Sequence, residues 1–158
     1  MVFQKIKHTA YPPTNKPLMI WDGNCGFCAY WITKWQSTTK DKVNYSSYLE
    51  VAGQFPDIDL RHFKQASRLI EPSGAIFSGP RSAYRTFAYG SRWAFLDHWY
   101  ENKRWFSSLS DNLYNWVTHN RGLLFTISKY CFGSNPNASK PFWLLYLILI
   151  GALLALFV

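Results

Sequence analysis

The sequence contains only three cysteines, Cys25, Cys28 and Cys131, and a single Cys-x-x-Cys pair. Its four histidines show no spacing of the H-x-x-x-H kind, so a zinc site with four protein ligands is not indicated. We therefore expect no cofactor and no resident metal ion. A metal-carrying protein that uses Cys25 and Cys28, with Cys131 as a third ligand, stays open as an alternative.

Acidic residues, repeats and a signal-like N-terminus are also scarce or absent. The chain has nine Asp and Glu against 17 Lys and Arg, which gives a net charge of +8. It has no internal repeat and no low-complexity tract, which excludes a repeat array. Residues 1–17, MVFQKIKHTAYPPTNKP, contain no apolar stretch of signal-peptide length, so we expect the chain to stay in a reducing compartment. Structural disulfides are rare there, and the cysteine pair needs another explanation.

Apolar and aromatic residues are abundant instead, at 48% and 19% of 158 residues, with eight Trp. This composition excludes a disordered chain and fits one domain of ordinary size. The basic charge is compatible with a nucleic acid or with an anionic lipid surface. The segment Trp93–Phe106 interleaves rings with Lys103 and Arg104, and we interpret it as a surface beside a membrane, with no nucleic-acid partner.

The last 17 residues, FWLLYLILIGALLALFV, carry no charged side chain. As a helix, Phe142–Val158 would be roughly 25 Å long, slightly short of the ~30 Å hydrocarbon core of a bilayer. Lys140 can extend to the interface, and Trp143 and Tyr146 suit it. We therefore expect a transmembrane helix over residues 142–158 and a single-pass protein of the cell membrane. Its N-terminal domain would lie on the cytoplasmic side, because the positive charge precedes the span. A hydrophobic core helix is the alternative.

Hydrophobic patterning and turn residues divide the rest of the chain into alternating strands and helices. Residues 1–15 form a basic leader and residues 134–141 a linker. Strands are expected at 16–21, 42–49, 67–70 and 75–78, the last two joined as a hairpin by the Pro-Ser-Gly turn at 72–74. Helices are expected at 29–36, 56–66, 81–89, 107–119 and 122–132. The order β, α, β, α, β, β, α predicts an α/β fold with a thioredoxin-like sheet and extra C-terminal helices, followed by the one C-terminal transmembrane helix.

The stretch WDGNCGFC, residues 21–28, places the cysteine pair directly after an apolar strand and at the start of a helix. Unpaired backbone N–H groups and the helix dipole favour an anion at that point, so we expect Cys25 to be the attacking thiolate. Cys28, one turn further along, is placed to attack the resulting mixed disulfide and release the product. Gly26 would let another chain approach closely, and Phe27 would offer it an apolar contact. A redox pair is favoured over half of a metal site and over two inert thiols.

Asp22 and Arg121 are the charged candidates near this pair. Asp22 could accept N–H groups of the turn and of the helix start, or it could relay a proton from Cys28 during exchange. Arg121, with Tyr114 and Asn120, could neutralise an anionic group near the thiolate, or the three could fix the ends of the C-terminal helices. The third cysteine lies on an apolar helix and is expected to be packed rather than redox-active.

Three stretches resemble the DCC family of thiol-disulfide oxidoreductases, which takes its name from one Asp and two Cys. They are DGNCGFC after the first strand, the hairpin segment EPSGAIFSGPRSAYR, and LYNWVTHNR, in which Tyr114, Asn120 and Arg121 match the family's Tyr and Asn-Arg positions. The resemblance covers about residues 17–133 and implies a thioredoxin-like DCC domain over residues 16–133.

Together with the predicted anchor, the resemblance implies a membrane-anchored thiol-disulfide oxidoreductase that acts on a protein or small-molecule thiol or disulfide. This chain departs from thioredoxins because no proline precedes the strand at 67–70, where thioredoxins carry a cis-proline whose backbone pairs with a bound peptide. The hydrophobic tail lies outside the family's core. A non-catalytic subunit of a membrane protein complex stays open as a second function. The residues implied for catalysis are Cys25, Cys28 and Asp22, and those implied for substrate binding are Gly26, Phe27 and Arg121.

Overall fold

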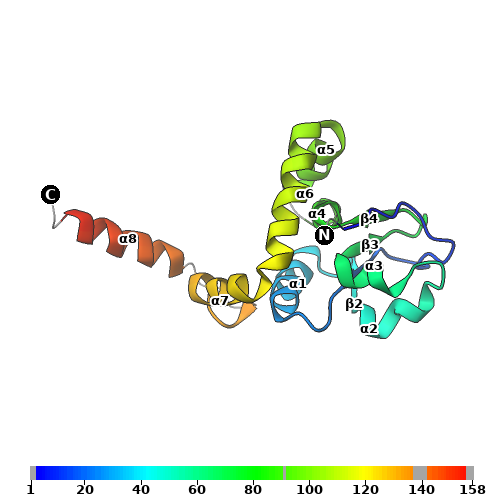
Figure 1. Cartoon of the computed structure of the whole chain (residues 1–158), viewed down its shortest axis with the longest axis horizontal. Coiled ribbons are helices and arrows are strands. Elements are labelled where there is room, and N and C mark those ends of the chain that lie inside the picture. The colour runs from blue at the N-terminus through cyan, green and yellow to red at the C-terminus, as the bar shows by residue number, and fades with distance from the viewer. Residues whose placement is uncertain (1–2, 91, 137–141, 156–158) are drawn as a thin grey trace.

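The structure is a computed structural model that describes residues 3–90, 92–136 and 142–155. Within these residues the chain is an α/β protein with eight α-helices and a four-stranded mixed sheet (Figure 1). Short 3-10 turns lie at Ala52–Gln54 and Arg92–Ala94. The strands are β1 (Leu18–Trp21), β2 (Asn44–Ser47), β3 (Arg68–Ile70) and β4 (Ile76–Ser78). The helices are α1 (Gly26–Thr39), α2 (Tyr48–Val51), α3 (Leu60–Gln65), α4 (Pro80–Ala88), α5 (Phe95–Asn102), α6 (Arg104–His119), α7 (Arg121–Phe132) and α8 (Phe142–Ala155).

The strands follow one another across the sheet in the order β2-β1-β3-β4. β1 runs parallel to β2, a pairing that needs a crossover, and α1 supplies it. β3 lies antiparallel to both β1 and β4, and the β3–β4 hairpin turns at Gly74. Gly74 has a φ of 84°, a backbone conformation in which only glycine avoids strain. The hairpin predicted from the Pro-Ser-Gly turn at 72–74 is therefore confirmed.

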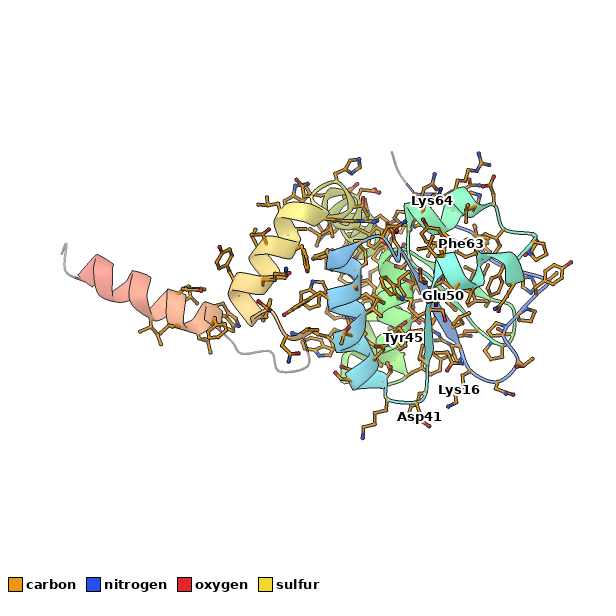
Figure 2. The ribbon with its side chains drawn as sticks, turned by 90° about the horizontal axis from the view of Figure 1, so that it is seen from below. Lys16, Asp41, Tyr45, Glu50, Phe63 and Lys64 are labelled. Carbon is orange, nitrogen blue, oxygen red and sulfur yellow. A yellow bond between two sulfur atoms is a disulfide. The ribbon has the colours of Figure 1, made fainter. Side chains whose placement is uncertain are left out.

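The sheet is covered by apolar side chains on both faces, because successive strand residues point to opposite sides. On one face, Ile20 and Ile70 belong to a buried cluster that includes Phe63 of α3. On the other face, Met19 and Leu69 pack with Ile32 of α1. Figure 2 shows α3, with Phe63 and Lys64, on one side of the sheet and α1 on the other. The sheet is thus the middle of three layers, with helices on both of its faces.

The helices that follow the sheet form a second group against α1 and α4. Figure 1 shows α5 and α6 side by side beyond α4, α7 beside α1, and α8 extending away from the sheet. Because α6 passes α4 and leads directly into α7, residues 104–132 reach back to the helix that carries the cysteine pair. The basic leader also contacts the sheet, since Thr9 N donates to the Gly74 carbonyl at 3.0 Å.

Two local predictions differ from the structure. The strand expected over residues 42–49 ends at Ser47, because the Ser47 hydroxyl accepts the N–H of Leu49 at 3.2 Å and so begins α2. The aromatic segment 92–106, for which no element was predicted, contains α5, whose buried Tyr100 donates to Asp111 of α6 at 2.6 Å. The Ser47 cap marks the start of α2, whereas the Tyr100–Asp111 bond joins α5 to α6.

The C-terminal helix overturns the predicted transmembrane span. α8 has 14 residues, and at 1.5 Å per residue it is about 21 Å long, against the ~30 Å of a hydrocarbon core. In the part of the chain that the structure describes, no helix is both long and apolar enough to cross a membrane. The predicted transmembrane helix over residues 142–158 is therefore wrong, and so is the single-pass location with a cytoplasmic N-terminal domain. Residues 156–158 of that span and 137–141 of the predicted linker lie outside the described residues.

Candidate functional site

The cysteine pair lies at the carboxyl end of β1, in the turn that leads into α1. Asn24 N donates to Oδ1 of Asp22 at 3.1 Å, and Cys25 N donates to the Asp22 carbonyl at 3.0 Å. These two bonds fold residues 22–25 into a tight turn in which an aspartate side chain mimics the backbone. Cys25 then stands immediately before the first residue of α1, with extended backbone angles (φ −106°, ψ 104°). The turn thus delivers Cys25 to the helix start, as the sequence predicts.

The sulfur atoms of Cys25 and Cys28 are at disulfide distance, and their Cα atoms are 5.2 Å apart. Cys25 Sγ also accepts the backbone N–H of Cys28 at 3.1 Å, so this sulfur caps α1. Orphan N–H groups and the helix dipole stabilise negative charge at such a position. Both cysteines are half-buried. The arrangement is consistent with a redox pair, and Cys25 is the sulfur that the helix start favours as an anion.

Asp22 pairs with Arg121, the first residue of α7. Arg121 Nη1 donates to Oδ2 of Asp22 at 3.0 Å, across a sequence separation of 99 residues. The same carboxylate holds the turn through Asn24, as described above. The structure therefore brings Arg121 to the cysteine turn, and it gives Asp22 a visible part in shaping that turn.

α7 covers the start of α1. A Cβ placed on Gly26 would lie only 3.1 Å from the ring of Phe125, so the close approach at this glycine is made by the chain's own α7. Further along, the hydroxyl of Tyr30 donates to the Gly133 carbonyl at 2.9 Å, and the rings of Trp31 and Phe132 meet edge to face at 5.8 Å. Figure 2 shows α7 lying alongside α1 on the side away from the sheet. Gly26 itself stays exposed, so α7 narrows the approach that was expected for another chain at this residue without closing it.

A cavity of about 360 Å³ lies beside the pair, where β1 ends and β3 begins. Its wall is mostly apolar, and it is lined by Cys28, Asp22 and Arg121, but not by Cys25. The predicted contact residue Phe27 also lines it. Its size falls within the range of small-molecule sites, roughly 300–1,000 Å³. The aromatic and aliphatic wall is contributed by α1 (Phe27, Trp31, Trp35), α4 (Ala83, Phe87) and α6 (Val117).

Tyr114 of α6 has a contact that the sequence reasoning missed. Its hydroxyl accepts the backbone N–H of Ser67 at 3.0 Å and lies 3.2 Å from the Ser67 hydroxyl. Ser67 immediately precedes β3, and both residues line the cavity. The only sequence signal for Tyr114 was its match to a Tyr position of the DCC family. Nothing near Tyr114 in the sequence indicated that it would bond to Ser67.

Two titratable side chains on α1 are shifted by burial beneath α7. Burial raises the pKa of the Tyr30 phenol, which therefore stays neutral while it donates to the Gly133 carbonyl. Burial lowers the pKa of Lys34, whose ammonium lies 4.6 Å from the centre of the Phe132 ring. Both shifts follow from the packing of α7 on α1.

The third cysteine, Cys131, lies on α7 as a free, half-buried thiol. Among the described residues, no group of three or more His, Cys, Asp or Glu side chains is gathered in a way that could hold a metal ion. The metal-carrying alternative therefore finds no third ligand beside Cys25 and Cys28 in this part of the chain.

Comparison with protein-family models, with curated proteins and with solved structures finds no match to this chain. The function is accordingly inferred from the residues and the geometry of the site itself.

Proposed function

We propose that the protein is a thiol-disulfide oxidoreductase of the kind that the DCC resemblance implies, with Cys25 and Cys28 as its redox pair. The observation that carries this proposal is the position of Cys25, whose sulfur caps α1 and accepts the N–H of Cys28 at 3.1 Å while lying at disulfide distance from Cys28. A sulfur in this position is stabilised as a thiolate, which is the form that attacks disulfides and that leaves most readily from them.

The surrounding fold supports the same function. A four-stranded sheet in the order β2-β1-β3-β4, with β1 parallel to β2 and a β3–β4 hairpin, is the arrangement expected of a thioredoxin-like sheet. The cysteine pair follows β1 and opens α1, which is where a redox pair of that type would lie. The substrate is a thiol or a disulfide, carried by a protein or by a small molecule.

Asp22 and Arg121 act in this proposal as positioning residues. The Asp22 carboxylate holds the turn through Asn24 N and accepts Arg121 Nη1, so its charge is compensated beside the thiolate. An uncompensated carboxylate at this place would disfavour the Cys25 thiolate. The Asp22–Arg121 ion pair therefore shapes the turn without disfavouring the Cys25 thiolate.

The test is a redox titration of the full-length chain combined with mapping of its thiols. We expect the pair to interconvert between dithiol and disulfide with a potential in the range of about −120 to −270 mV. Limiting iodoacetamide on the reduced protein should label Cys25 before Cys28 and Cys131. Cys25→Ser and Cys28→Ser should each abolish the disulfide, and Cys131→Ser is the matched control that should leave it unchanged. A pair that mild diamide does not oxidise, or that co-purifies with stoichiometric zinc, would refute the proposal.

The exposed apolar side chains on α6 and α7, among them Trp116 and Ile127, favour the second candidate, a non-catalytic subunit of a larger complex. The two functions differ in their need for the cysteines. A variant with both Cys25→Ser and Cys28→Ser should lose all exchange activity if the protein is an oxidoreductase, whereas a docking subunit would keep its association with the complex.

A further inference from the structure

The cavity beside Cys28 has the size and the apolar lining of a small-molecule site. It lies at the end of the sheet between α1, α4 and α6, and it reaches the pair at Cys28 rather than at Cys25. A group held there would therefore meet one particular sulfur of the disulfide.

Two contacts restrict the pairing of an extended polypeptide beside the cysteine pair. The backbone N–H of Ser67, beside the cavity, is already bonded to the hydroxyl of Tyr114 at 3.0 Å, so it is not left to pair with a bound peptide. The Phe125 ring lies 3.1 Å from where a Cβ on Gly26 would stand, so it narrows the approach of a second chain at this exposed glycine. The cavity itself, at about 360 Å³, suits a small molecule.

The wall favours an apolar molecule, because most of its surface is apolar and several of its polar groups are already bonded within the chain. A charged or strongly polar ligand would lose its water for few new partners, which is unfavourable. The exceptions are Lys64, which is exposed, and Trp31, whose Nε1 is buried without an acceptor in the described part of the chain. The bonded polar groups of the wall are Tyr84 with Ser110, Tyr114 with Ser67, Asp22 with Arg121, and Thr118 with the Asn115 carbonyl.

We propose that the substrate is a small, largely apolar thiol, or the corresponding disulfide, which the cavity presents to Sγ of Cys28. This inference rests on the proposed redox function of the pair and names its substrate class. In the oxidised protein the thiolate of the bound molecule attacks Cys28 Sγ and forms a mixed disulfide there. The Cys25–Cys28 bond breaks, and its electron pair leaves on Cys25 Sγ, the sulfur that the helix start stabilises.

A second molecule of the thiol completes the reaction. Its thiolate attacks the substrate sulfur of the mixed disulfide, so a small disulfide is released and the electron pair of the broken bond passes to Cys28 Sγ, which takes up a proton. Two thiols are thereby oxidised by two electrons, and the protein disulfide is reduced to the dithiol. For such a substrate the attacking and resolving roles expected from helix position are exchanged. Cys28 carries the mixed disulfide, and when the dithiol reduces the small disulfide, Cys25 is the thiol that resolves it.

The experiment compares two monothiols on the oxidised full-length chain: benzyl mercaptan, which is apolar, and glutathione, which is charged. The rate with benzyl mercaptan divided by the rate with glutathione should be at least about tenfold higher for the native chain than for the same chain unfolded in guanidinium. Burial of the benzyl ring among apolar side chains stabilises the bound thiol by that much. Acid quenching followed by alkylation should place the benzylthio group on Cys28 and the alkylating agent on Cys25. An equal ratio in the native and unfolded chains, or an adduct on Cys25, overturns the inference.

Cavity-filling variants supply the matched control. Ala83→Leu puts extra carbon atoms into the cavity and should lower the benzyl mercaptan rate about tenfold, whereas Ala88→Leu, on the exposed end of the same helix, should not change it. If Ala83→Leu fails to fold, Val117→Phe on α6 fills the same space from the opposite wall. Dithiothreitol should reduce every folded variant at the wild-type rate. Equal benzyl mercaptan rates in Ala83→Leu and Ala88→Leu refute the proposed substrate class but leave the redox function standing. A Cys25–Cys28 disulfide that no thiol reduces refutes the redox function as well.

Discussion

Replacing Arg121 with alanine should loosen α7 from the cysteine turn, and the structure sets the size of the effect. Arg121 Nη1 and Asp22 Oδ2 are 3.0 Å apart, and the two side chains are 21% and 22% exposed. An exposed ion pair contributes about 0–1 kcal/mol, whereas removing one partner of a fully buried pair costs about 3–5 kcal/mol. Because about a fifth of each side chain meets water, we expect Arg121→Ala to lower the free energy of unfolding by about 1–2 kcal/mol.

Thermal unfolding followed by tryptophan fluorescence measures this loss as a decrease in Tm of about 2–8 °C for a chain of this length. Arg104→Ala is the matched control, since Arg104 is the exposed first residue of α6 just as Arg121 is the first of α7. In a double-mutant cycle, Asp22→Asn and Arg121→Ala should couple by about 1 kcal/mol. A Tm change no larger than that of Arg104→Ala, or strictly additive effects in the cycle, would show that this ion pair does not hold α7 in place.

Three further substitutions test the packing around the site. Gly26→Ala should stabilise the protein less than Gly122→Ala, because a Cβ at position 26 meets the Phe125 ring at 3.1 Å whereas one at position 122 meets nothing within 4 Å; equal changes in Tm would contradict this. Tyr114→Phe should cost about 1–3 kcal/mol in urea unfolding, since it leaves a backbone N–H without its acceptor, and an unchanged midpoint would mean that water replaces the hydroxyl. Burial raises the pKa of Tyr45 to about 12 in the folded protein, so the stability that depends on its proton is complete below about pH 10 and is lost as the pH rises to about 12. Tyr45→Phe should therefore make Tm fall less steeply between these pH values, and an identical slope would contradict the shift.

The local parts of the fold could be predicted because short-range chemistry specifies them. The apolar run before Asp22, the turn at Gly23 and Asn24, and the helix that follows reappear as β1 and α1. The hairpin follows from the Pro-Ser-Gly turn at 72–74, and Pro80 stands at the first position of α4. In each case a residue with a special backbone preference fixes the boundary.

The relation between distant segments could not be predicted in the same way. Nothing near Arg121 in the sequence indicates that it would pair with Asp22, and the pattern favoured a network at the helix ends instead. The cavity is likewise a property of how α1, α4 and α6 pack together, which single-sequence periodicity does not report. The uncharged C-terminal run was misread because a helix of roughly 25 Å was accepted as long enough to span, whereas α8 has 14 residues and is only about 21 Å long.

The distance along the chain between the thiol pair and its cover has a consequence for synthesis. A ribosome adds about 5–20 residues per second, so the 99 residues that separate Asp22 from Arg121 take about 5–20 s to appear. During that interval the sheet and the start of α1 have been made, while α7 does not yet exist to cover Gly26 or to compensate the Asp22 charge. The cysteine turn is therefore made well before the Asp22–Arg121 bond can form, and the arrival of α7 is the event that completes the surroundings of the pair.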